Sequence, residues 1–267
     1  MSLELFWFLP TSGDTRYLGK SDFGRAPTLD YMRQIAVTSE ALGYDGLLIP
    51  TGASCLDPWV VAASLVPVTQ RIKLLVALRT SLGGPGPSAR QAATLDQALN
   101  GRLLLNVVPG GDATELEADG VFLKHDERYE AADEYLTIWR KLLQGETVNY
   151  EGKHFRIRNG QLFHPAIQQP YPPLYFGGSS PAAHDLAAKH VDAYQPGANH
   201  PPPSNRRSKT YANAPPSKAA PSDSAYACMP SCAKPRPKPG PTPNASSANS
   251  PTKTLPAPSR TTPRWIQ

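Results

Sequence analysis

The chain has 267 residues and a net charge of +5, but the positive charge is confined to its last part. Residues 1–194 carry 17 Lys and Arg against 21 Asp and Glu, whereas residues 195–267 carry 10 basic residues and a single acid. The acidic balance of residues 1–194 excludes a nucleic-acid-binding domain there, and the absence of any apolar run near the roughly 18 residues that span a bilayer excludes a membrane protein.

Short, nearly continuous apolar runs recur along residues 1–194. Such runs are typical of strands buried on both faces in a parallel sheet. They cover residues 3–9, 46–49, 72–78, 103–108 and 174–176, and residues 191–194 begin a sixth.

Segments with apolar residues at three- and four-residue steps separate these runs and predict helices. Asp57 before Pro58, and Ser180 before Pro181, have the residue types of a helix N-cap followed by proline in the first turn. A hairpin is predicted over residues 147–157, turning at Glu151-Gly152. The predicted helices cover residues 29–42, 57–66, 89–99, 126–143 and 181–191.

This alternation of strands and helices predicts an α/β fold with right-handed βαβ units and a parallel sheet. A complete eight-unit barrel needs about 250 residues, so residues 1–194 predict an incomplete (β/α)8 TIM barrel. An open doubly wound sheet is the alternative, although the first strand-to-helix turn lacks the Gly-x-Gly-x-x-Gly phosphate loop.

Residues 195–267 have a different composition. They hold 17 of the 30 prolines, and Leu255 and Ile266 are their only representatives of Leu, Ile, Val and Phe. A segment so poor in large apolar groups cannot offset the chain entropy lost on ordering, so we expect a disordered basic tail. Three cysteines form no disulfide framework and no secretory leader opens the chain, which favours the cytoplasm.

The loop Gly177-Gly178-Ser179-Ser180-Pro181 is the best candidate for a binding site. It joins a predicted buried strand to a helix whose free N–H groups and dipole attract an anion, so a phosphate is the natural occupant. An ordinary N-cap explains the same residues equally well.

Three other side chains follow or lie near strand ends. Cys55 has no base beside it in the sequence, so a small lining residue or a buried inert thiol is favoured over a nucleophile. His125 and Tyr129 are four residues apart and share a helix face; they either hold a cofactor phosphate or are a surface histidine above a core tyrosine. The remaining histidines have no metal-ligand spacing.

The chain resembles the flavin-dependent alkanesulfonate monooxygenases, which are bacterial-luciferase-like barrels. The resemblance covers residues 1–194 and includes GYDGLLIPTGASCLDPWVVAASLVPVTQRIKLLVALR, ARQAATLDQALNGRLLLNVVPGGD and IQQPYPPLYFGGSSPAAHDLAA. It implies a two-component system in which a separate NAD(P)H-dependent reductase supplies reduced FMN. The barrel then uses dioxygen to convert an alkanesulfonate to an aldehyde and sulfite, and such enzymes are expected to be homo-oligomers.

The resemblance also implies roles for particular residues. Cys55 matches a cysteine near the oxygen-reacting part of the flavin, and Asn106 lies where the family lines the flavin ring. His125 and Tyr129 match a pair that reaches the ribityl phosphate chain. Ser179 and Ser180 match the phosphate-binding turn.

The sequence departs from the family in two ways. Ser12 stands where the family commonly has a histidine, and the resemblance stops at Tyr194, before the family's substrate-binding arginines. The abrupt change inside a predicted strand leads to the hypothesis of a reading-frame shift and an impaired product. The alternative is a non-catalytic flavin-binding scaffold with a basic, proline-rich interaction tail.

Overall fold

A computed structural model describes residues 4–14 and 24–194. Its main sheet has six strands, and all of them are parallel and lie in chain order, which confirms the predicted α/β fold with a curled, half-barrel sheet. The predicted disordered tail and reading-frame shift fall on residues 195–267, which lie outside the described residues. The strands are β1 (Phe6–Phe8), β2 (Gly46–Ile49), β3 (Lys73–Arg79), β4 (Leu103–Val108), β7 (Leu174–Phe176) and β8 (Ala193–Tyr194).

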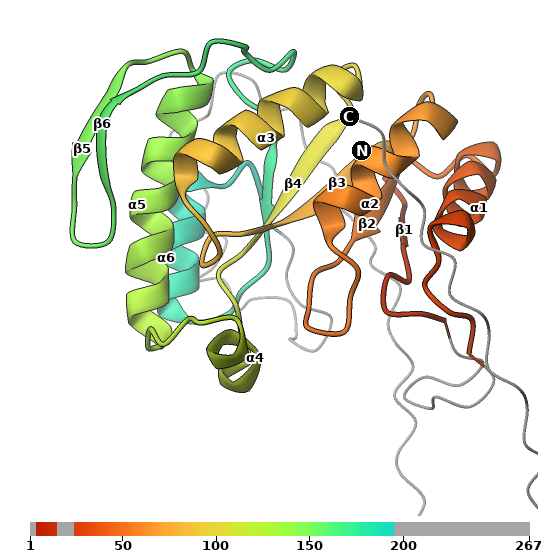
Figure 1. Cartoon of the computed structure of the whole chain (residues 1–267), viewed down its shortest axis with the longest axis horizontal. Coiled ribbons are helices and arrows are strands. Elements are labelled where there is room, and N and C mark those ends of the chain that lie inside the picture. Colours follow the sequence, from red (N-terminus) through yellow and green to blue (C-terminus); the bar gives the residue numbers. More distant parts are fainter. Residues whose placement is uncertain (1–3, 15–23, 195–267) are drawn as a thin grey trace, which may run out of the picture. The chain divides into compact units, whose positions relative to one another are not determined.

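Helices connect successive strands of this sheet (Figure 1). Neighbouring helices pack against one another, α1 on α2, α3 on α5 and α5 on α6. No helix of the described residues is long and apolar enough to cross a membrane. The helices are α1 (Leu29–Ala41), α2 (Pro58–Leu65), α3 (Pro85–Ala98), α4 (Ala113–Ala118), α5 (His125–Leu143) and α6 (Pro181–His190), with a 3-10 turn at Val66–Val68.

The helix starts follow from local hydrogen bonds. Asp57 accepts from the N–H groups of Trp59 and Val60 at 3.0 and 2.9 Å, and Ser180 accepts from Ala183 N–H at 3.2 Å, which confirms both predicted N-caps.

The prediction for α3 was wrong at its beginning. The helix begins at Pro85 and not at residue 89, because proline needs no hydrogen-bond partner for its nitrogen in a first turn. The sequence GGPGPS reads locally as a loop.

The six-residue helix α4 was not predicted. It is rich in acidic residues and has one buried side chain, Leu116, so it has no apolar stripe that the sequence could show.

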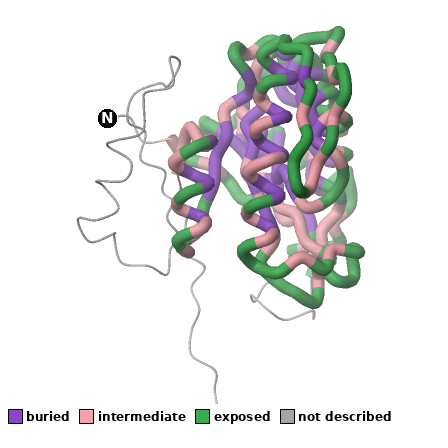
Figure 2. Tube along the Cα trace, turned by 90° about the vertical axis from the view of Figure 1, so that its left-hand side faces the viewer, coloured by how far each residue is buried: buried purple, intermediate pink, exposed green. Residues whose placement is uncertain are grey.

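Strands β2, β3, β4 and β7 bury apolar side chains on both faces, as the continuous apolar runs predict. The same prediction was wrong for β1, where Trp7 and Phe8 are 38% and 54% exposed, because β1 lies at the edge of the described sheet. The main core lies between the sheet and the helices and includes Leu74, Leu105 and Phe176. A smaller cluster of Leu75, Leu104 and Tyr175 lies on the inner face. Figure 2 shows the buried residues gathered inside the helical layer and the exposed ones outside it.

The predicted hairpin forms as β5 (Val148–Glu151) and β6 (Arg156–Gly160), an antiparallel pair separate from the main sheet. Glu134 of α5 holds it, because its carboxylate accepts three backbone N–H groups from residues 153–155 at 2.8, 3.0 and 3.0 Å.

A similar carboxylate clamp lies at the amino ends of the strands. Glu40, on α1, accepts the N–H groups of Gln70, Arg71 and Ile72 at 2.9, 2.8 and 2.9 Å. Burial alone would raise the pKa of Glu40, but these three donors lower it below its ordinary value. These three N–H groups lie in the segment directly before β3. The Glu40 carboxylate therefore holds the backbone of that segment in place.

We expect Glu40→Ala to lower the free energy of unfolding by about 1–2 kcal/mol, since one carboxylate satisfies three N–H groups. Urea denaturation at pH 7 measures the change. Glu117→Ala is the matched control, because Glu117 is exposed on α4 and its carboxylate accepts no backbone N–H group within residues 4–14 and 24–194. Equal stabilities for the two variants would contradict the clamp.

The interface of α5 and α6 contains a buried histidine. His190 Nε2 lies 2.6 Å from an Asp133 oxygen, and Arg140 approaches His190 Nδ1 at 3.4 Å. Burial lowers the pKa of His190 to about 4 and outweighs the opposing effect of Asp133. The imidazole is therefore neutral at pH 7, accepting from Arg140 and donating to Asp133.

This neutral histidine predicts acid lability. The unfolded chain binds the proton with a pKa near 6.5, so stability is complete above that pH and falls as the pH drops toward about 4. We expect about 2 kcal/mol less stability at pH 5 than at pH 7 from this group. Urea denaturation at both pH values measures the free energy of unfolding. The difference between the two pH values should shrink in His190→Gln. The exposed-site control His164→Gln keeps the full difference; an unchanged difference in His190→Gln would refute the assignment.

Candidate functional site

The carboxyl ends of the strands lie along one edge of the sheet, because every pairing is parallel. The loops that follow the strands meet there. Leu56 N–H, in the loop after β2, donates to Thr11 O in the loop after β1 at 2.9 Å. We call this edge, with its loops, the mouth; in a β/α barrel it is the functional end.

Three of the predicted cofactor residues come together at the mouth. The His125 and Tyr129 rings on α5 have their centroids 4.9 Å apart, and the Tyr129 hydroxyl forms a hydrogen bond with Ser180 at the start of α6. Burial raises the pKa of Tyr129, and the contact with Ser180 opposes that rise only in part. At pH 7 the phenol is therefore neutral and keeps a proton to donate.

The turn before α6 is tightly packed. A Cβ at Gly178 would lie 2.8 Å from both the Ala183 Cβ and the Phe176 ring, so no larger residue fits without movement. The Tyr194 hydroxyl donates to Gly178 O, which ties β8 to the turn. Ser179 is exposed beside Ser180. The turn therefore presents a hydroxyl at the N-terminus of a ten-residue helix, where partial positive charge gathers.

Asn106 lies on the inner face of the sheet. It is two residues from Leu104, which belongs to the inner cluster, and side chains two apart on a strand share a face. Its register partners are Ala77 on β3 and Tyr175 on β7. Asn106 is half-buried and therefore reachable from the mouth, whereas Tyr129 packs against the core on the helix side.

Cys55 lies in the loop between β2 and α2 as a half-buried free thiol. Its backbone N–H donates to Gly52 O at 2.9 Å, which folds the loop back on itself. The structure thus places Cys55 at the mouth on the β2 side, on a different segment from the His125, Tyr129 and Ser180 group.

Sequence reasoning placed Arg79 at the end of a predicted strand but gave it no role. Its side chain is only 8% exposed, and its guanidinium pairs with Glu115 and, at 3.2 Å, with Asp119. A charged residue at the end of a buried apolar strand is the one feature of the sequence that could have indicated Arg79. Its acidic partners could not be inferred from the sequence, because α4 was not predicted.

The mouth also holds hydroxyls with unused hydrogen-bonding capacity. Thr11 Oγ1, Thr80 Oγ1 and Ser81 Oγ are buried and have no hydrogen-bond partner within residues 4–14 and 24–194. These residues follow β1 and β3. Buried polar atoms without partners are rare, and at a mouth they fit a site built to receive a polar ligand. Within the described residues no cluster of His, Cys, Asp and Glu could hold a metal ion.

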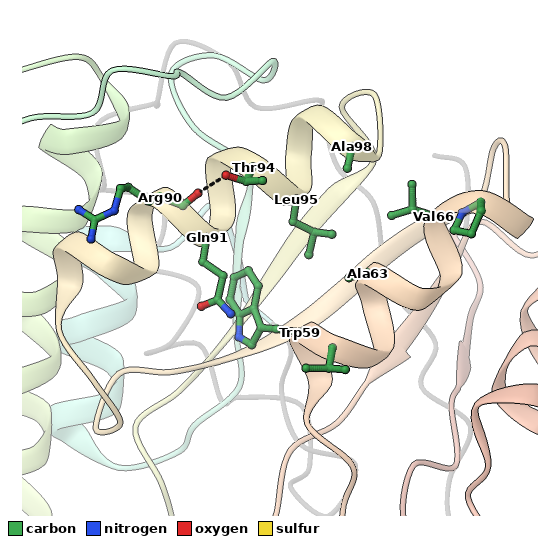
Figure 3. Close-up of a pocket in the computed structure, with 10 residues that line it drawn as sticks. Trp59, Ala63, Val66, Arg90, Gln91, Thr94, Leu95 and Ala98 are labelled. Carbon is green, nitrogen blue, oxygen red and sulfur yellow. Dashed lines mark hydrogen bonds between the residues drawn. The ribbon is translucent and has the colours of Figure 1, made fainter. Parts of the chain in front are cut away.

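A separate groove of about 620 Å3 lies on the outer side, between α2 and α3 (Figure 3). Trp59 of α2 lies beside Gln91 of α3, with Leu95 further along the same helix. None of the predicted site residues lines this groove. It is therefore a feature of the helical layer and not of the mouth.

A family model described as luciferase-like monooxygenase matches residues 3–230. A riboflavin lyase, solved with modified FMN and riboflavin, matches with 25% identity and a TM-score of 0.63, covering 73% of this chain and 54% of that one. The EDTA monooxygenase of Chelativorans sp. BNC1 has 21% identity and a TM-score of 0.65 over 73% and 55% of the two chains. A long-chain alkane monooxygenase has 23% identity and a TM-score of 0.64 over 73% and 56%. The chain thus spans about half the length of these structures.

The tight packing at Gly178 yields a prediction. We expect Gly178→Ala to lower the free energy of unfolding by about 1–3 kcal/mol, because the added methyl group meets Ala183 and Phe176. Gly86→Ala is the control, since a Cβ there meets nothing within 4 Å. Thermal unfolding of both variants checks this, and a Gly178→Ala midpoint equal to that of the control would contradict the packing argument.

Proposed function

Because the chain belongs to the luciferase-like monooxygenase family, we propose that it is a flavin-dependent monooxygenase whose mouth binds reduced FMN. The observation that carries this proposal is the meeting of Tyr129 and Ser180 at the N-terminus of α6. A helix N-terminus with hydroxyl donors is suited to a phosphate. The exposed Ser179 supplies a further hydroxyl.

The other residues of the mouth fit the remainder of a flavin nucleotide. Asn106 offers an amide on the inner face, where it can hydrogen-bond to the edge of a planar ring. The unpartnered hydroxyls of Thr11, Thr80 and Ser81 suit polar ligand atoms. Cys55 borders the mouth from the β2 loop and is proposed as the residue near the oxygen-reacting part of the flavin. His125 lies beside Tyr129 and is proposed to contact the ribityl phosphate chain.

We propose an alkanesulfonate as the substrate, on the strength of the long sequence runs shared with that group of enzymes. Reduced FMN, when bound, supplies two electrons with which dioxygen is reduced. One oxygen atom enters the substrate carbon next to sulfur and the other leaves as water, while the C–S bond breaks to give an aldehyde and sulfite. A separate NAD(P)H-dependent reductase would return the flavin to its reduced form. The chain's own part is to bind the flavin, to orient the substrate and to exclude water from the mouth.

The second candidate is a flavin-binding protein without catalysis. The observation that favours it is that the match covers only 54–56% of the three compared structures, so nearly half of each has no counterpart among the matched residues. Flavin binding is common to both candidates, and turnover separates them.

The test is anaerobic calorimetric titration of the full chain with reduced FMN, and in parallel with reduced riboflavin. We expect Ser180→Ala to weaken FMN binding about tenfold, since a hydrogen bond to a charged group is lost. Riboflavin has no phosphate, so its affinity should not change. Ser64→Ala on α2 is the control, because the Ser64 hydroxyl, like that of Ser180, bonds to the backbone of its own helix, donating to the Val61 carbonyl at 2.7 Å.

Sulfite release from a short alkanesulfonate, with a flavin reductase present, then decides between the two candidates. Sulfite production supports the monooxygenase, and binding without sulfite supports the non-catalytic protein. If the unmodified chain does not bind reduced FMN, both are wrong. Equal losses of FMN and riboflavin affinity in Ser180→Ala would instead assign Ser180 to helix capping alone.

A further inference from the structure

Arg79 lies on the inner face of the sheet at the mouth. It is four residues beyond Leu75, a member of the inner cluster, so the two side chains leave β3 on the same side. In the sheet register Ala77 pairs with Asn106, and Arg79 pairs with Val108 two residues nearer the mouth. Arg79 therefore stands directly outside the row that contains Asn106.

The Arg79 guanidinium grips α4 at two points. One terminal nitrogen pairs with Glu115 in the helix and the other with Asp119, the C-cap residue one helical turn later. The planar guanidinium presents its two N–H edges in a fixed geometry, which a lysine cannot do. At 8% exposure Arg79 is also shielded from water, in contrast to the exposed pair Lys153 and Glu130, at 63% and 55%. The partners of Arg79 are less buried, with Glu115 at 26% and Asp119 at 36% exposed. Removing one partner of a largely buried pair leaves an uncompensated charge, which costs more than breaking an exposed pair.

The helix α4 has little else to hold it. With six residues it is too short to be stable alone. Its one buried side chain, Leu116, packs against Gly110, where a Cβ would lie 2.7 Å from a Leu116 methyl group. Asp112 caps the helix through Glu115 N–H at 2.9 Å, which is a contact within the same segment. The Arg79 clamp and Leu116 are therefore what fix α4 to the sheet.

The position of α4 connects the two halves of the proposed site. It follows β4, which carries Asn106, and precedes α5, which begins at His125. It lies beyond the carboxyl end of β4, apart from the layer of α3, α5 and α6 (Figure 1). Because the Arg79 side chain leaves the inner face at the carboxyl end of β3, it holds its acidic partners beside the mouth.

We propose that Arg79 is a positioning residue that fixes α4 as a cover over the mouth and so sets the flavin-binding geometry between Asn106 and His125. This inference rests on the proposed function. It assigns Arg79 no contact with the reacting atoms, because its terminal nitrogens are already engaged by Glu115 and Asp119. Loss of the clamp frees α4, admits water to the mouth and loosens the bound cofactor.

The experiment compares Arg79→Gln, Arg79→Lys and Glu115→Gln in the full chain. Glu117→Gln is the matched control, because Glu117 is an exposed carboxylate on the same helix outside the clamp. Hydrogen–deuterium exchange of residues 113–119 reports on α4, and exchange in β3 and α3 shows that each variant remains folded. Anaerobic titration with reduced FMN gives the affinity. The ratio of hydrogen peroxide to sulfite reports water entry, which a purely structural role elsewhere would not change.

We expect Arg79→Gln and Glu115→Gln to speed exchange in α4 roughly tenfold or more and to weaken FMN binding by a similar factor, with Arg79→Lys between them and the parent. A variant that combines Arg79→Gln with Glu115→Gln should show the same exchange rate and FMN affinity as Arg79→Gln alone, because the two residues share one interaction. The hydrogen peroxide fraction should rise in the same order. The control should match the parent in every measurement.

If hydrogen–deuterium exchange in α4 is the same in Arg79→Gln and in the parent chain, Arg79 does not hold α4. Faster exchange with unchanged FMN affinity would overturn the positioning role while leaving the clamp as a structural contact. If the parent chain binds no reduced FMN, the proposed function fails together with the flavin part of this inference, and the exchange comparison still decides whether Arg79 holds α4.

Discussion

Parallel pairing of six strands in chain order is the constraint on which the other features depend. Because all six run the same way, every strand-to-helix loop leaves the sheet at one edge, and residues as distant in sequence as Thr11 and Leu56 come into contact there. Each crossover places a helix on the outer face, where the main core forms, and the inner cluster covers part of the other face, so β2, β3, β4 and β7 are buried on both sides. The mouth is the necessary product of this pairing, and the particular loop residues then determine what it can bind.

The two ends of the sheet differ in how their polar groups are satisfied. At the amino ends, Glu40 accepts three backbone N–H groups and Arg102 donates to the carbonyls of Thr69 and Ile72. At the mouth, the hydroxyls of Thr11 and Thr80 are buried and have no partner in the part of the chain that the structure describes. Polar groups that are hydrogen-bonded at the amino ends stabilise the sheet. Buried hydroxyls without partners at the mouth lower its stability, which is typical of positions where a ligand can supply the missing hydrogen bond.

The candidate flavin site depends on contacts between segments that are far apart in the chain. Tyr129 reaches Ser180 only because α5 and α6 pack side by side, and Asp133 with His190 and Lys189 holds that interface. The position of His125 in turn depends on α4, which is tied to β3 through Arg79. The site is therefore only as well ordered as the helix contacts around it.

The sequence by itself determined the strands, most helices and two N-caps, because these follow from local patterns. A buried strand must be a continuous apolar run, and Asp57 and Ser180 cap helices through N–H groups two or three residues away. The candidate residues at the strand ends were visible for the same reason. Their grouping was not, since nothing in the local pattern states that Tyr129 meets Ser180 or that Asn106 stands beside Tyr175. The helix α4 and its clamp were decided only by the tertiary structure: a six-residue acidic segment has no periodicity of its own and becomes a helix where Arg79 and Leu116 attach it to the sheet.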